Sequence, residues 1–161
     1  MFVSSLSRSS GMVNAAFLQE VKESNAEVWH SLHAVRAIAE GVQDRVPNAD
    51  VAHEFVRQLD ALLDGIATEF SLEETLGFVG GVAVGSAAPD SDLAKSACQH
   101  RELFLTLQEV VEQAEEVQYR GTVVRDCPAL LAEFHTFDSA LRKHEEFEAE
   151  LIRMHLGKNA F

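Results

Sequence analysis

The segment GIATEFSLEETLGF, residues 65–78, has the apolar spacing of a buried helix but carries glutamate where that spacing calls for leucine or valine. The residues before it fix the phase of the helix, because their apolar side chains recur in alternating steps of three and four. These residues are Phe55, Leu59, Leu62 and Ile66. The same steps lead next to Glu69 and Glu73, so both carboxylates are predicted to point into the core.

Three prolines, Pro47, Pro89 and Pro128, separate segments with helical periodicity. A helix interior disfavours proline, because its ring removes an N–H donor and clashes with the preceding turn. Polar residues in VPNAD and APDS can cap the helices that follow them, and Gly157 can end the last one. The sequence therefore predicts four helices, over residues 15–44, 50–78, 91–119 and 129–156.

These helices predict an all-α fold, an antiparallel up-down-up-down four-helix bundle. The bundle is expected to form a single domain over residues 15–157, after a flexible leader over residues 1–14 and before a short tail over residues 158–161. The glycine-rich linker VGGVAVGSAAP is expected to be mobile.

Polar residues also interrupt the apolar seams of the other helices. Asn25 and His100 lie about ten residues after the starts of the first and third helices. Four further residues lie roughly five to twelve residues before the ends of the second and fourth helices: Glu69, Glu73, His144 and Glu148. In an up-down-up-down bundle these depths coincide, so the six side chains are predicted to share one buried layer near one end.

Three buried carboxylates need protons, ionic partners or bound cations, because burial penalises their charge. Neither lysine nor arginine lies on the seams at this depth, so a metal centre is the simplest explanation. Carboxylates combined with imidazoles suit iron, manganese or zinc better than calcium. Five strong ligands, with Asn25 as a weak sixth, exceed the need of one ion and predict two ions, which can be Fe, Mn or Zn.

Three strings resemble motifs of hemerythrin-like domains. EFSLEETLGF, from Glu69, resembles the HFxxEExxG pattern, QHRELFLTL is similar to HxxLLxxL, and LRKHEEFEAELI resembles HExxExxLL. The first helix, ESNAEVWHSLHAVRA, matches only in its apolar rhythm. The resemblance implies a non-haem di-iron centre with Glu73 as the bridge, and with Glu69, His100, His144 and Glu148 as further ligands.

The chain also departs from the family pattern. Asn25 and Glu69 fill slots in which the family has histidine, and Ser96 stands where oxygen carriers have a second histidine in the third helix. A more anionic, oxygen-rich site stabilises the ferric state and so suits reversible O2 binding poorly. The departures leave two alternatives: different chemistry, such as peroxide or iron handling, or lost metal affinity.

Composition limits the classes of partner. The net charge of -13 disfavours nucleic acid and anionic membrane surfaces. No apolar run approaches the roughly 20 residues of a membrane span. Cys98 and Cys127 form no disulfide framework and are expected to be reduced, as in a cytoplasmic protein.

The leading expectation is a metal-binding protein that senses or handles oxygen, peroxide, nitric oxide or iron. A metal-free bundle that acts as an interaction or regulatory module is the alternative. A di-iron peroxidase or oxidase is a third possibility, which rests on the metal alone because the sequence has no nucleophile paired with a base and no phosphate-binding loop.

Overall fold

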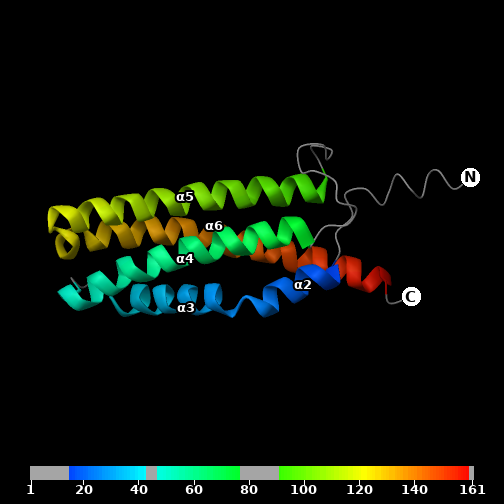
Figure 1. The fold of residues 1–161 in the computed structure, drawn as a ribbon, viewed down its shortest axis with the longest axis horizontal. Helices are drawn as coiled ribbons and strands as arrows, with labels where there is room; N and C mark the ends of the chain where they lie inside the picture. Colours follow the sequence, from blue (N-terminus) through cyan, green and yellow to red (C-terminus); the bar gives the residue numbers. More distant parts are fainter. Residues whose placement is uncertain (1–14, 43–46, 77–90, 160–161) are drawn as a thin grey trace, which may run out of the picture. The chain divides into compact units, whose positions relative to one another are not determined.

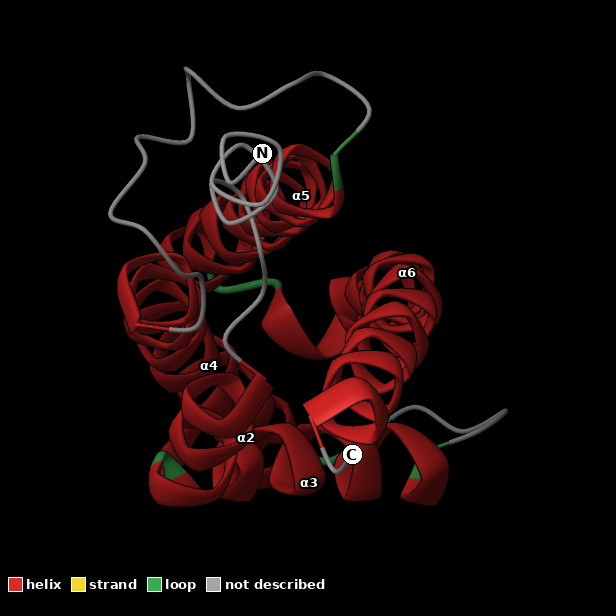
Figure 2. Cartoon of the chain, turned by 90° about the vertical axis from the view of Figure 1, so that its right-hand side faces the viewer, coloured by secondary structure: helices red, strands yellow, loops and turns green. Residues whose placement is uncertain are grey.

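A computed structural model describes residues 15–42, 47–76 and 91–159 of the chain, and it is helical apart from caps and turns (Figure 2). Five helices follow one another in this part of the chain (Figure 1): α2 (Ala15–Ser24), α3 (Ala26–Gly41), α4 (Ala49–Leu76), α5 (Asp92–Arg120) and α6 (Val123–Asn159). The described ranges contain no strand, which confirms the all-α class. The leader over residues 1–14, the linker VGGVAVGSAAP and its Pro89 lie outside the described residues.

The predicted cap at the end of APDS, Ser91, is confirmed, and the second helical segment is capped by Asn48 of VPNAD. Asn48 Oδ1 accepts a hydrogen bond of 2.8 Å from the backbone N–H of Val51 at the start of α4. Ser91 Oγ accepts one of 3.1 Å from the backbone N–H of Ala94 at the start of α5. Each cap provides a partner for a backbone donor that the first helical turn leaves unpaired.

The first predicted helix is interrupted at Asn25, which separates α2 from α3. The backbone N–H of Asn25 still donates to the carbonyl of Val21. Its side-chain amide donates to Glu69 of α4. Asparagine has a low helix propensity, because its side chain competes for hydrogen bonds with backbone groups. The apolar periodicity continues through this position and therefore did not predict the break.

The prediction that Pro128 precedes the last helix is wrong, because Pro128 lies inside α6. Helix α5 ends at Gly121, whose φ of 75° is the left-handed conformation that favours glycine. The N–H groups of Gly121 and Thr122 donate to carbonyls of the last turn of α5, as in a Schellman motif. The new helix then begins at once and buries Val123 and Cys127 before it reaches the proline. Their burial offsets the missing hydrogen bond at Pro128.

The other end of α6 also differs from the prediction. The helix continues to Asn159, so Gly157 does not terminate it.

The chain divides into two compact units. The first, called here the apolar-core unit, comprises α3 together with residues 49–67 of α4, 103–120 of α5 and 123–141 of α6. Its core is mainly aliphatic and aromatic and includes the predicted seam residues Phe55, Leu59, Leu62 and Ile66; Phe134 is in edge contact with Phe55 and stacked on Phe137. Arg36 and Asp138 form an ion pair within it, with Arg36 Nη2 2.7 Å from Asp138 Oδ1.

Gly65 allows α3 and α4 to approach closely within the apolar-core unit. A Cβ atom at this position would lie 3.1 Å from Val28 Cβ and 3.2 Å from Val28 Cα. Gly65→Leu is therefore expected to lower the free energy of unfolding by about 1–3 kcal/mol, as overpacked cores do. Urea denaturation measures the change. Gly41→Leu is the control, because nothing lies within 4 Å of a Cβ atom at Gly41. Equal stabilities of the two variants would contradict the prediction.

The second unit, called here the polar-core unit, contains α2, Asn25 and residues 68–76 of α4, 91–102 of α5 and 142–159 of α6. Its buried apolar side chains are few: Ala15, Leu18, Val21, Phe70 and Leu151. Its buried polar side chains are Glu69, Glu73, Ser96, His100, His144 and Glu148. The same helices thus carry two different kinds of core, and the polar one holds five of the six predicted ligands in buried positions.

Candidate metal centre

Four of the predicted ligands meet in the polar-core unit. Glu73 comes from α4, His100 from α5, and His144 and Glu148 from α6, where the spacing of four places the last two on one helix face. Each offers one ligand atom, and these atoms all lie within 4.8 Å of one another. All four side chains are buried. This buried group of two carboxylates and two imidazoles could hold a metal ion.

Glu69 and Asn25, the other predicted ligands, form a separate pair beside this group. Glu69 is only 2% exposed, and its Oε1 accepts a hydrogen bond of 3.1 Å from the half-buried Asn25 Nδ2. Burial, together with a hydrogen bond and charge repulsion from Glu73, raises the pKa of Glu69 to about 8. Neither residue belongs to the group whose ligand atoms lie within 4.8 Å of one another, so the pair belongs to the surroundings of that four-residue group.

His144 has the hydrogen bonding of a metal ligand. Its Nδ1 lies 2.6 Å from Gln99 Oε1, an acceptor, so this nitrogen donates its proton to the amide. Its Nε2 faces Glu148 Oε1 in an ion-pair contact but has no hydrogen bond of acceptable geometry. Metal-binding histidines typically donate one ring N–H to a second residue and present the other nitrogen to the ion.

His100 differs from His144 in that both of its ring nitrogens contact carboxylates. Its Nδ1 lies 3.0 Å from Glu74 Oε2, and its Nε2 lies 2.9 Å from Glu148 Oε1 and 3.1 Å from Glu73 Oε2. Burial opposes the charged form of His100, but the hydrogen bonds to the three carboxylates outweigh it and raise the pKa to about 10. Glu74, which lies one position beyond the seam residue Glu73, is therefore the orienting partner of this imidazole.

Lys22 is the main residue that the sequence analysis missed. Its Nζ lies 2.5 Å from Glu148 Oε2 and 3.2 Å from Glu73 Oε1, so the buried carboxylates have an ionic partner although no lysine lies on the seams at this depth. Burial opposes its charge, but the two carboxylates outweigh this effect and raise its pKa above the ordinary value. The contacts of Glu148 with His100, His144 and Lys22 in turn outweigh burial and hold its pKa well below the ordinary range.

The helical phase explains why Lys22 was missed. It follows Val21, a seam residue, and so lies one position off the apolar face. Its flexible stem carries the ammonium group back toward the core.

Phe70 forms one wall of the site. Its ring stacks on His100 with a centroid distance of 4.0 Å, and it meets His144 edge-on at 5.6 Å. The spacing of one residue after Glu69 turns Phe70 toward α5, and its side chain is buried. An apolar wall lowers the local polarity and strengthens electrostatic interactions inside the site.

Unpaired buried atoms test whether a cation fits the group. Several buried side-chain atoms of the described polar core lack a hydrogen bond of acceptable geometry: Glu69 Oε2, Glu73 Oε2, His144 Nε2 and Ser96 Oγ. Buried polar atoms normally have partners. Glu73 Oε2 has only the ion-pair contact with His100 Nε2, and His144 Nε2 has only the contact with Glu148 Oε1; a cation bound between these ligand atoms would give each of them a partner. The residues therefore fit a metal ion.

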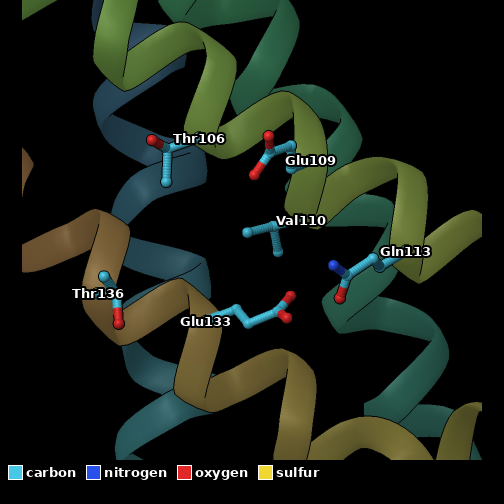
Figure 3. Close-up of a pocket in the computed structure, with 6 residues that line it drawn as sticks. All are labelled: Thr106, Glu109, Val110, Gln113, Glu133 and Thr136. Atoms are coloured by element: carbon cyan, nitrogen blue, oxygen red, sulfur yellow. The ribbon is translucent and has the colours of Figure 1, made fainter.

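A second polar feature is a pocket of about 200 Å3 in the apolar-core unit, between α5 and α6 (Figure 3). Glu133 of α6 points toward Gln113 of α5 (Figure 3), whose amide nitrogen can donate to the Glu133 carboxylate at 2.8 Å. Glu133 thus has a partner. None of the predicted ligands lines this pocket, whose lining residues are Thr106, Glu109, Val110, Gln113, Glu133 and Thr136. The polar-core unit is the better candidate site.

Comparisons with protein-family models, curated proteins and solved structures found no match to this chain. The resemblance to hemerythrin-like domains therefore rests on short sequence motifs alone, and no comparison supports it. Among the described helices, none combines the length and apolar character needed to cross a membrane.

Proposed function

We propose that this protein binds a transition-metal ion through Glu73, His100, His144 and Glu148. The observation that carries the proposal is the orientation of His144, whose Nδ1 donates to Gln99 while its Nε2 faces a buried carboxylate. A histidine that served packing alone would not need this arrangement. Two imidazoles and two carboxylates are ligands that iron, manganese and zinc accept.

The proposed architecture is a hemerythrin-like four-helix bundle, and the proposed metal is iron. The motifs around Glu73, His100 and His144 support the family, and the mixed ligand set supports a redox-active metal. The proposed role is sensing or handling of oxygen, peroxide, nitric oxide or iron. The carboxylate of Glu74, which lies 3.0 Å from His100 Nδ1, favours the ferric state and so favours peroxide or iron handling over reversible O2 transport.

Metal binding is expected to stabilise the protein measurably. A metal at about 100 times its dissociation constant adds about 2.7 kcal/mol, which corresponds to a rise in melting temperature of roughly 5–10 °C for a chain of this size. Differential scanning calorimetry before and after addition of ferrous iron under anaerobic conditions measures this rise. His144→Ala is expected to abolish it, and His30→Ala, a change at an exposed residue of α3, is expected to leave it intact.

Elemental analysis of the same samples completes the test. Less than a tenth of an equivalent of any transition metal after loading with ferrous iron would contradict the proposal. An equal rise in melting temperature for His144→Ala and His30→Ala would contradict the assignment of the ligands.

A metal-free interaction or regulatory module is the second candidate. The observation in its favour is the ion pair between Lys22 and Glu148, since the charges of Lys22 and His100 can balance those of Glu73 and Glu148. Such a module would show no metal in elemental analysis and no change in melting temperature with any of the three metals.

A further inference from the structure

Glu73 and Glu148 each direct one carboxylate oxygen toward the imidazoles and the other toward Lys22. Glu73 Oε2 lies 3.1 Å from His100 Nε2, whereas Glu73 Oε1 lies 3.2 Å from Lys22 Nζ. Glu148 Oε1 faces both imidazoles, whereas Glu148 Oε2 lies 2.5 Å from Lys22 Nζ. The carboxylates therefore bridge two cation positions, one on the imidazole side and one at the lysine ammonium.

In helical bundles that hold two metal ions, carboxylates from the facing helices serve both ions. We infer that the ammonium group of Lys22 occupies the second cation position, so that the centre holds one metal ion next to an ammonium and not two metal ions. The inference rests on the proposed function. It replaces the two metal ions that the sequence predicts with one metal ion and one lysine ammonium group.

Charge and burial support a fixed ammonium at this position. The Lys22 side chain is 20% exposed, and both carboxylates that it contacts are at most 1% exposed. The repulsion between the ammonium and a neighbouring cation grows in proportion to the charge of that cation, so it is twice as large for a divalent ion as for a monovalent one. A second metal ion could therefore enter only if Lys22 left, because the ammonium would repel it and already uses one oxygen of each carboxylate.

The ligand count agrees with a single ion on the imidazole side. That side offers His100, His144 and one oxygen each from Glu73 and Glu148, which is a complete set for a four-coordinate ion and allows added water or substrate for a larger coordination number. The lysine side offers no imidazole among the described contacts of these carboxylates. The two positions are therefore chemically different, and the imidazole side is the one for the metal.

Counting bound ions in the full chain tests the inference. Wild-type protein and Lys22→Met are dialysed to equilibrium against Zn2+ and analysed for zinc and sulfur. Wild type is expected to bind one ion, and Lys22→Met is expected to bind two, since both bridging carboxylates then have a free oxygen. Lys95→Met is the matched control, because Lys95 is exposed on α5 in the same unit, and it is expected to bind one ion.

Each other outcome has a defined meaning. Two ions in the wild type, or fewer than two ions in Lys22→Met, would overturn the inference and leave the proposed function standing. No ion in the wild type would overturn both.

Electron paramagnetic resonance of the Mn2+-loaded wild type provides a second measurement that does not depend on the folding of a variant. The six-line signal of an isolated ion supports the inference, and the spectrum of an exchange-coupled pair overturns it.

Discussion

Replacement of Glu148 by alanine is expected to abolish metal binding and to lower the free energy of unfolding by about 3–5 kcal/mol. Glu148 is fully buried and contacts His100, His144 and Lys22. Its removal deletes a ligand, and it also leaves the buried ammonium and imidazolium with Glu73 as their main buried counter-charge. Urea denaturation at pH 7, combined with elemental analysis of the loaded protein, measures both effects.

Glu146→Ala is the matched control for this change, because Glu146 is exposed on the same helix two residues earlier. It is expected to alter the free energy of unfolding by no more than about 0.5 kcal/mol. Glu148→Gln keeps the shape of the side chain and removes its charge, so it separates the effect of the lost charge from the effect of the lost side chain. A loss below about 1 kcal/mol for Glu148→Ala would show that the ionic cluster does not stabilise the fold.

Protein treated with a chelator is expected to lose stability as the pH rises from about 5 to 8. The pKa of Glu69 is about 8 in the folded chain against an ordinary value of 4.5, so the folded state retains a proton that the unfolded state releases. Stability from this group is complete below pH 4.5 and is lost as the pH rises through 8. One such proton changes the free energy of unfolding by up to about 1.4 kcal/mol per pH unit.

His100 and Glu148 set the limits of the pH range over which the stability declines. The pKa of His100 rises from 6.5 to about 10 on folding, so its contribution is complete below pH 6.5 and is lost as the pH rises through 10. Glu148, whose pKa is depressed, acts in the opposite direction and loses its contribution as the pH falls below about 4.5. Stability of the metal-free protein should therefore be greatest near pH 5.

Glu69→Gln isolates the first of these groups, because glutamine can still accept the hydrogen bond from Asn25 but does not titrate. Urea denaturation at pH 5, 6, 7 and 8 is expected to show a shallower decline for this variant than for the wild type. The exposed Glu20→Gln on α2 is expected to follow the wild type. Parallel curves for all three proteins would refute the role of Glu69.

The apolar periodicity predicted the burial of the candidate ligands correctly. Phe55, Leu59 and Leu62 fix the phase of α4, and the same steps lead to Glu69 and Glu73, which are both buried. The result follows because a helix has one repeat, so a few core residues determine the direction of every side chain on it.

Residues outside the seam were not predictable in this way. Lys22 and Glu74 each lie one position beyond a seam residue, and they reach the centre through flexible side chains whose direction the helical repeat does not specify. The position of Pro128 was missed for another reason. The turn at Gly121 and Thr122 is closed by backbone hydrogen bonds, and the burial of Val123 that starts α6 early depends on tertiary packing.

The contrast between the two cores affects the heat capacity of unfolding. Exposure of apolar groups raises the heat capacity, and exposure of polar groups lowers it. Unfolding of the apolar-core unit exposes side chains such as Phe55 and Phe134, whereas unfolding of the polar-core unit exposes carboxylates and imidazoles. The heat-capacity increment should therefore come mainly from the apolar-core unit. The free energy of unfolding should therefore depend on temperature with a stronger curvature for the apolar-core unit than for the polar-core unit.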